Sequence, residues 1–316
     1  MKIIDKEING KKIVTVLMGN EIWSPENDLP NPTMPYENSK VLSGDMEAGD
    51  TYFYTGESHT NIKDVATMHK EGRLVGAHRT RVEATFEGSY QKEISEKLKT
   101  EFYQQRRRQR RNEYDGEINL DAYMASDPNF YTKVERVKRK DKKITVLVNT
   151  CYGGNISASE ITSDMSRVFA KVNNLIKQGF NVEIYAGMVA GGGWQKTGAT
   201  EKTTPSTSAA LVIVKEANMP IDRERFMCMA HSSFLRLVLF RAFSCGASIY
   251  NQSFRPTTTL GSVINGNDGR CAEWLSTVLD GMINTDKVLY FDSVFLEGIE
   301  ITSPKLEDVQ ASFAKA

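Results

Sequence analysis

The stretch 143–187, KITVLVNTCYGGNISASEITSDMSRVFAKVNNLIKQGFNVEIYAG, decides the fold class of this chain. It begins with an apolar run, Ile144–Val148, and ends with a second one, Phe180–Ala186. A turn that contains two glycines and a long segment with apolar residues at helical spacing lie between them. This order predicts strand, turn, helix and strand, which is a βαβ unit with parallel strands.

The helix of this unit is predicted for residues 159–178. Its apolar residues follow an i, i+3, i+4 pattern, so one face is expected to pack on a sheet. Ser157 and Glu160 match a capping box at its start. Gly179 stands where a glycine commonly ends a helix.

The remaining elements are predicted from the same kinds of signal. Asn9-Gly10 between two apolar runs predicts a hairpin, since both residues tolerate the positive φ of a type I′ turn. Further strands are expected at 51–55, 208–216, 247–254 and 288–295, and further helices at 61–70, 90–111, 232–246, 271–282 and beyond Ser303. The fold class predicted is α/β, with a doubly wound, mostly parallel sheet at 141–316. Residues 1–140 are predicted to form an N-terminal α+β elaboration with a hairpin, a Pro-rich loop and an Arg-rich helix.

Composition restricts the compartment and the partners. The 316 residues include 40 Lys or Arg and 40 Asp or Glu, so net charge favours no class of partner. The four cysteines lack C-x2-C spacing and are expected to be reduced thiols. Charges interrupt the apolar residues near the N-terminus, and no apolar run reaches the ~20 residues that span a bilayer. We expect a cytoplasmic protein (host-cell cytoplasm if viral) with no membrane partner.

No motif for catalysis or cofactor binding is complete. GGGWQKTG departs from the phosphate-binding pattern G-x-x-x-x-G-K-[ST] at its first glycine and before Lys196. His59, His69 and His78 lack metal-ligand spacing, and His231 beside Ser232 has no third residue to orient it. A phosphate held by the Gly153-Gly154 turn is a weaker hypothesis. We therefore predict no catalytic residue, no metal and no cofactor, and a protein that is not an enzyme.

Two basic segments favour an anionic partner. The first, at the end of the predicted helix 90–111, contains Arg106, Arg107, Arg108, Arg110 and Arg111. The second, 133–143, has seven Lys or Arg and includes Lys138, Arg139 and Lys140. Nucleic acid is one interpretation, with Tyr103, Tyr114, Phe130 and Tyr131 nearby for stacking on bases. The alternatives are a favourable interaction with the helix dipole and pairing with the acidic stretch 115–127.

The order of predicted elements after residue 143 resembles a von Willebrand factor A domain. In that family a metal-ion-dependent adhesion site, D-x-S-x-S, follows the first strand, and its oxygens hold Mg²⁺. The matching positions here are Asn149, Cys151 and Gly153, and all three differ. The resemblance therefore implies an A-like fold with a degenerate site that has lost its metal. The whole order, from TYFYTGESHTNIKDVATMHKEG through AHSSFLRLVLFRAF, also resembles uncharacterised proteins of tailed bacteriophages.

These observations predict a non-enzymatic protein-interaction scaffold, a phage accessory protein that uses the apical end of the A-like domain. The predicted partner surface consists of Asn149, Cys151, Tyr152, Gly153, Gly154, Asn155 and Trp194. The alternative is an accessory protein of phage transcription or replication that binds single-stranded DNA or RNA. The partner of the first hypothesis is another protein of unknown identity.

Overall fold

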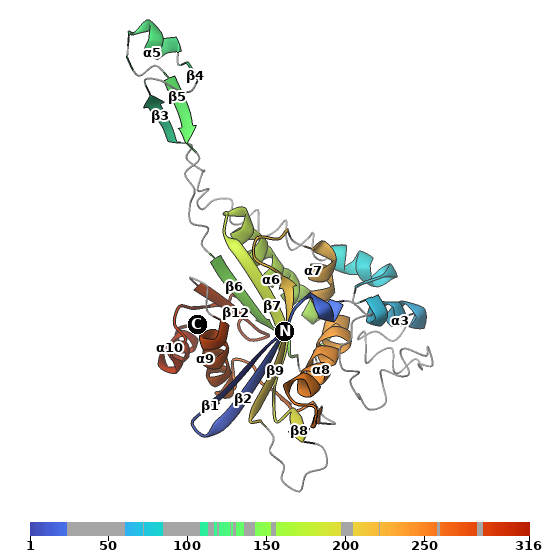
Figure 1. The fold of residues 1–316 in the computed structure, drawn as a ribbon. Coiled ribbons are helices and arrows are strands. Elements are labelled where there is room, and N and C mark those ends of the chain that lie inside the picture. The colour runs from blue at the N-terminus through green and yellow to red at the C-terminus, as the bar shows by residue number, and fades with distance from the viewer. Residues whose placement is uncertain are drawn as a thin grey trace.

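The computed structural model describes residues 1–23, 61–71, 73–84, 108–112, 117–118, 120–126, 128, 131–135, 143–152, 156–196, 205–220, 222–257, 260–282 and 287–316. One sheet organises most of them, with strands ordered β1-β2-β9-β7-β6-β12-β13 (Figure 1). Their bounds are Lys2–Ile8 (β1), Lys11–Met18 (β2), Thr207–Lys215 (β9), Asn181–Gly191 (β7), Lys143–Asn149 (β6), Lys287–Phe291 (β12) and Ile299–Ile301 (β13). β11 (Ser262–Val263) pairs with the end of β7.

The sheet is mixed, and its centre is parallel. β6 pairs in parallel with β7 on one side and with β12 on the other, and β2 pairs in parallel with β9. The other pairs are antiparallel, including β7 with β9 and the hairpin β1–β2. The α/β class predicted from the sequence is confirmed. The N-terminal hairpin is part of this same sheet, because β2 pairs with β9.

Helices cover both faces of the sheet (Figure 1). One face carries α3 (Ile62–Glu71), α6 (Ala158–Lys177), α7 (Arg223–Met229), the π-helix η2 (Phe234–Leu239) and α8 (Phe240–Tyr250). The other face carries α9 (Arg270–Met282) and α10 (Leu306–Lys315). Successive residues of a strand point to opposite faces, so Val146 packs in the first core and Leu147 in the second. The structure also describes η1 (Asn20–Trp23), a helix at 76–84, and the short pair β8 (Trp194–Lys196) and β10 (Phe254–Pro256).

Several elements lie where the capping and turn residues of the sequence predicted them. The Ser157 hydroxyl accepts from the amide of Glu160, and the Glu160 carboxylate accepts from the amide of Ser157 in return, so the capping box is present. Gly179 has φ +85°, the left-handed conformation that ends α6. Asn9 and Gly10 have φ 55° and 72°, as the predicted hairpin turn requires.

The structure corrects the region after His231. Residues 247–250 are helical, so the predicted strand at 247–254 is wrong, and α8 continues past Gly246 to Tyr250. Gly246 therefore does not stop the helix. A Cβ at this position would lie 3.0 Å from the Trp194 ring, so the glycine admits that ring against the helix. The predicted strand 51–55 lies outside the described residues.

A second, three-stranded sheet has the order β3-β5-β4. It consists of β3 (Arg108–Asn112), β4 (Glu117–Ile118) and β5 (Tyr131–Glu135), with the short helix α5 (Leu120–Met124) between β4 and β5. We call these four elements the arm. Figure 1 shows the arm standing clear of the main sheet and its helices, with α5 at the far end.

Candidate interaction surfaces

The carboxyl ends of the parallel strands β6 and β12 lie side by side. We call this end of the main sheet its apical edge. β6 ends at Asn149, and β12 ends at Phe291, directly before Asp292. Val148 lies opposite Phe291 in the register, so the two polar residues that follow lie beside each other. This edge is where doubly wound folds bind their ligands, and it is the apical end that the sequence analysis singled out.

A buried hydrogen-bond network joins these two side chains. The Tyr290 hydroxyl accepts from the Asn149 side-chain nitrogen at 3.3 Å and donates to Asp292 Oδ2 at 2.8 Å. The Cys271 sulfur lies 3.2 Å from the same hydroxyl. Burial raises the pKa of Cys271 to about 12 and raises the pKa of Tyr290 above its ordinary value. The thiol and the phenol therefore stay protonated and serve to hold the strand ends together.

A remote segment closes this edge. The Asn149 side-chain nitrogen donates to the carbonyl oxygen of Ile264 at 2.7 Å, and the amide of Ile264 donates to Val189 at 3.2 Å. The amide of Gly266 donates to Asp292 Oδ2 at 2.6 Å. The segment 262–266 thus covers the ends of β6 and β12. Asn149 is 1% exposed, so the prediction that it lies on a partner surface is wrong.

Cys151 is also enclosed. Its thiol donates to the carbonyl oxygen of Val189 at 3.5 Å, and its amide donates to the Asn149 side-chain oxygen at 3.2 Å. Burial raises the pKa of the Cys151 thiol to about 12, which leaves almost no thiolate at neutral pH. The expectation that Cys151 contributes to an exposed turn is therefore wrong.

Tyr152 is the part of the predicted turn that retains an unsatisfied group. Its ring is buried, and its hydroxyl makes no hydrogen bond of standard geometry within the described part of the chain. Burial and, after it, the nearby Asp164 carboxylate raise the pKa of Tyr152. Burial likewise raises the pKa of Asp164. Gly153, Gly154 and Asn155 lie outside the described residues.

Trp194 does not lie on an exposed loop, contrary to the sequence prediction. It begins β8, its exposed fraction is 0%, and its indole nitrogen donates to the Phe243 carbonyl at 3.1 Å. Its ring stacks on Tyr250 with 6.1 Å between centroids. Trp194 therefore anchors α8 to the sheet edge and is not available to a partner.

The arginine-rich run forms a strand where it is described. Arg108, Arg110 and Arg111 lie in β3, so the prediction that they end a helix is wrong. Arg106, Arg107, Lys138, Arg139 and Lys140 lie outside the described residues. The structure therefore places three of the eight predicted nucleic-acid contacts on one edge strand of the arm.

In the arm, β3 and β5 pair as antiparallel strands along their whole length. Arg110 lies directly opposite Lys133, whereas Arg108 lies opposite Glu135. Asn112 lies opposite Tyr131.

The end of the arm carries exposed apolar side chains that the sequence analysis missed. Leu120 is 70% exposed, Met124 is 81% exposed and Tyr123 is 57% exposed, and all three lie on α5. Residues three and four apart share a helix face, so these side chains point the same way, while Ala122 is buried. Ile118 of β4 is 55% exposed. We call Ile118, Leu120, Tyr123 and Met124 the apolar tip. Within INLDAYM, the 120, 123, 124 spacing was the available signal.

Two histidines meet in the core on the α8 side of the sheet. His78 Nδ1 lies 3.3 Å from His231 Nε2. The amide of Ser233 donates to His231 Nδ1 at 3.0 Å, so that nitrogen is unprotonated and Nε2–H donates to His78. Burial lowers the pKa of both, that of His231 to about 3. Within the described residues, no three His, Cys, Asp or Glu side chains gather into a potential metal site.

Comparison with known proteins places the chain in one family. Residues 55–310 match a family described as Domain of unknown function (DUF7192), and the chain belongs to it. No curated protein matches the chain, and no solved structure does. Among the helices that the structure describes, none has the length and apolar character needed to cross a bilayer.

Proposed function

We propose that this protein is a non-enzymatic interaction scaffold that contacts a partner protein through the apolar tip of its arm. The observation that carries the proposal is the exposure of Leu120, Tyr123 and Met124 on one face of α5, at the end of an element that stands clear of the main body (Figure 1). Large apolar side chains gathered on a soluble surface are typical of protein-binding sites.

The energetics favour a partner over solvent at this position. Full burial of one Leu or Met side chain is worth about 1.5–3 kcal/mol, so a partner that covers Leu120 and Met124 gains several kcal/mol. Tyr123 adds an aromatic ring of the type that dominates binding energy in interfaces. Asn149, Cys151 and Trp194 of the originally predicted surface are buried, which moves the proposed contact from the sheet edge to the arm.

We further propose that the main sheet is a von Willebrand A-like domain without a metal. The order β9-β7-β6-β12 supports this, with a helix between the parallel strands β6 and β7 and an antiparallel β9 beside β7. The amide of Asn149 and the thiol of Cys151 replace the oxygen ligands that a Mg²⁺ site would need. The proposed role as a phage accessory protein rests on the sequence resemblance.

Affinity purification from the native host tests the arm. The double variant Leu120→Ser with Met124→Ser is expected to lose its main partner, with the thermal midpoint unchanged because both side chains are exposed. Ile3→Ser is the matched control, since Ile3 is 42% exposed but lies on β1 of the main sheet. Equal recovery of the partner by wild type and the double variant would refute the proposed contact.

Nucleic acid remains the second candidate, and the register of β3 and β5 favours it. The backbone register pairs Arg110 with Lys133 and Asn112 with Tyr131, so this ladder contains both basic residues and an aromatic residue, the two residue types that single-stranded nucleic acid binds. Filter binding of a single-stranded oligonucleotide across a salt series tests this. Arg110→Gln with Lys133→Gln is expected to reduce the salt slope by about 1.4, since each phosphate contact to a single strand contributes about 0.7. An oligonucleotide that does not bind at low salt would eliminate this candidate.

A further inference from the structure

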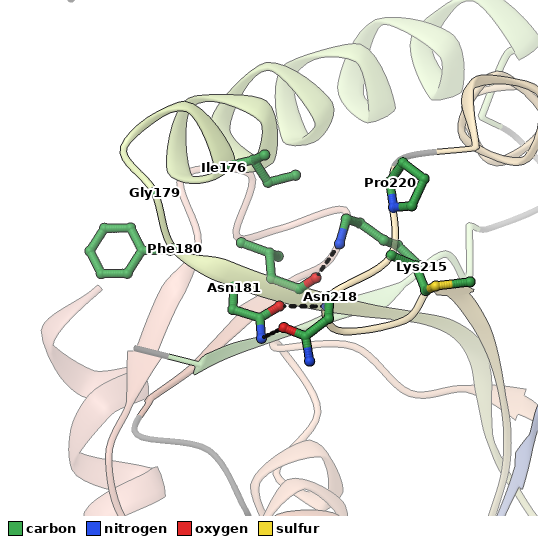
Figure 2. A pocket seen from close by; sticks show the side chains of 9 residues that line it. Ile176, Gly179, Phe180, Asn181, Lys215, Asn218 and Pro220 are labelled. Carbon is green, nitrogen blue, oxygen red and sulfur yellow. Dashed lines mark hydrogen bonds between the residues drawn. The ribbon is translucent and has the colours of Figure 1, made fainter. Parts of the chain in front are cut away.

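Figure 2 shows a pocket of about 310 Å³. It opens at the start of β7, which lies at the opposite end of the sheet from Asn149, because β7 runs parallel to β6. The end of α6, the start of β7 and the end of β9 with its following turn form its walls. Ile176, Phe180, Met219 and Pro220 give it an apolar lining. Its size is at the lower end of the range that small organic ligands occupy.

Among the described residues that line this pocket, Lys215 alone carries a formal charge. The residue is 6% exposed. Its ammonium donates to the carbonyl oxygens of Val182 at 2.8 Å and Glu216 at 3.0 Å, and Figure 2 shows the first of these bonds. An ammonium has three N–H donors, and in the described part of the chain the third has no acceptor. One donor therefore remains for a ligand.

The described residues provide this ammonium with no counter-ion within ion-pair distance. Glu183, the acidic residue that interacts with it electrostatically, forms its ion pair with Lys143 instead, at 3.1 Å. Burial lowers the pKa of Lys215 accordingly. A buried cation held by neutral carbonyls alone is costly, and an anion that enters beside it offsets the cost.

The turn beside Lys215 is held in a fixed shape. Asn218 has φ +63°, and its backbone amide donates to the Asn181 side-chain oxygen at 2.7 Å. The Asn181 side-chain nitrogen donates back to the Asn218 side-chain oxygen (Figure 2). This amide pair ties the turn to the start of β7, so Met219 and Pro220 stay in place as one wall of the pocket.

We propose that this pocket binds a small carboxylate with an apolar body. The carboxylate pairs with the free N–H of Lys215, and the apolar body contacts Ile176, Phe180 and Met219. A linear fatty acid of medium chain length has this chemistry. The inference is independent of the arm and of any partner protein.

Titration of the 316-residue chain with octanoate tests the site, with binding monitored by calorimetry or by amide chemical shifts. Octanoate is expected to bind the wild type, and octanamide, which has the same shape without the charge, about tenfold or more weakly. Lys215→Met keeps an apolar side chain of similar length and is expected to weaken octanoate binding about tenfold or more. Lys6→Met is the matched control, because Lys6 lies on β1, pairs with Asp280 and does not line the pocket; this variant is expected to bind octanoate as tightly as wild type.

A second variant covers the case in which Lys215→Met does not fold. Met219 is 57% exposed, so Met219→Asp is tolerated by the fold and brings a carboxylate to the pocket wall. The carboxylate of Met219→Asp is expected to pair with Lys215 in place of the ligand and so to abolish octanoate binding. Octanoate that binds Met219→Asp or Lys215→Met as tightly as wild type, octanamide that binds as tightly as octanoate, or no octanoate binding to wild type at about 10 mM would each overturn the proposal.

Discussion

The side-chain nitrogen of Asn149 donates a 2.7 Å hydrogen bond to the carbonyl oxygen of Ile264, across the end of the main sheet. A carboxylate at position 149 has no hydrogen to donate and would face that carbonyl oxygen with a negative charge. The side-chain amide of Asn149 is thus the group that closes this edge. The closed edge explains why the described apical residues form a structural network rather than an open site.

Asn149→Asp is expected to destabilise the protein by about 2–4 kcal/mol. The variant loses the hydrogen bond to Ile264 and places a second carboxylate near Asp292. Both carboxylates would then compete for the single hydroxyl proton of Tyr290. Urea denaturation measures the loss as a lower midpoint with an unchanged slope.

Asn251→Asp serves as the control for this substitution. Asn251 is exposed, and its side-chain oxygen only accepts, from the amide and hydroxyl of Ser253. The same exchange there is expected to change stability by less than about 0.5 kcal/mol. Equal stability of the Asn149→Asp variant and wild type would show that the Ile264 contact does not hold the edge closed.

Trp194→Ala is expected to lower the free energy of unfolding by about 3–5 kcal/mol, because it leaves a cavity at a fully buried position and removes the hydrogen-bond donor to the Phe243 carbonyl. Gln195→Ala, at the exposed neighbouring position, is expected to have little effect. Thermal or urea unfolding compares the two. If Trp194→Ala left the stability unchanged, Trp194 would not be a buried anchor, and the surface role predicted from the sequence would be supported.

Ser157→Ala is expected to destabilise the protein by about 1 kcal/mol, since it removes the side chain that caps α6. Ser163→Ala is the control, because Ser163 is exposed in the second turn of the same helix, where alanine is the better helix former. Urea midpoints should therefore move in opposite directions for the two variants. A shift of the same sign and size in both would contradict the capping role.

Elements with complete local signals were predictable from the sequence. The capping box at Ser157 and the glycine at position 179 identify α6 without reference to the rest of the chain. Gly246 shows where such signals fail. Its place in α8 follows from the Trp194 ring packed against it, and a contact so distant in sequence leaves no local pattern.

The site depends on still longer-range contacts. The strand end at Asn149 was predictable, but its burial depends on Ile264, 115 residues further along the chain. The run at 108–112 has arginines with good helix propensity, yet it forms β3 because it pairs with β5. The apolar tip was missed because three apolar residues on one short helix look like a core-facing stripe until the rest of the fold shows that Leu120 and Met124 face solvent.

Stability is expected to fall as the pH drops from about 6.5 towards 3, because His231 titrates near 6.5 when unfolded and has a pKa of about 3 in the folded protein. The depressed folded pKa means that the contribution of His231 is complete above about pH 6.5 and decreases as the unfolded state gains its proton. Protonation at Nδ1 would break the bond from Ser233, and the nearby His78, Arg81 and Arg236 oppose a new positive charge. At about pH 5 the loss attributable to His231 should be about 2 kcal/mol.

His231→Gln isolates this contribution from the other groups that titrate over the same range. Asp64 lies near His78 and acts in the opposite direction on that ring, by raising the pKa of His78. Asp164 has a raised folded pKa, so its own contribution increases stability as the pH falls. Both effects are common to wild type and His231→Gln. The difference between their unfolding free energies, measured in urea at several pH values, should therefore be constant above about pH 7 and shrink below it. A difference that does not change with pH would mean that His231 is not held neutral by its burial beside His78.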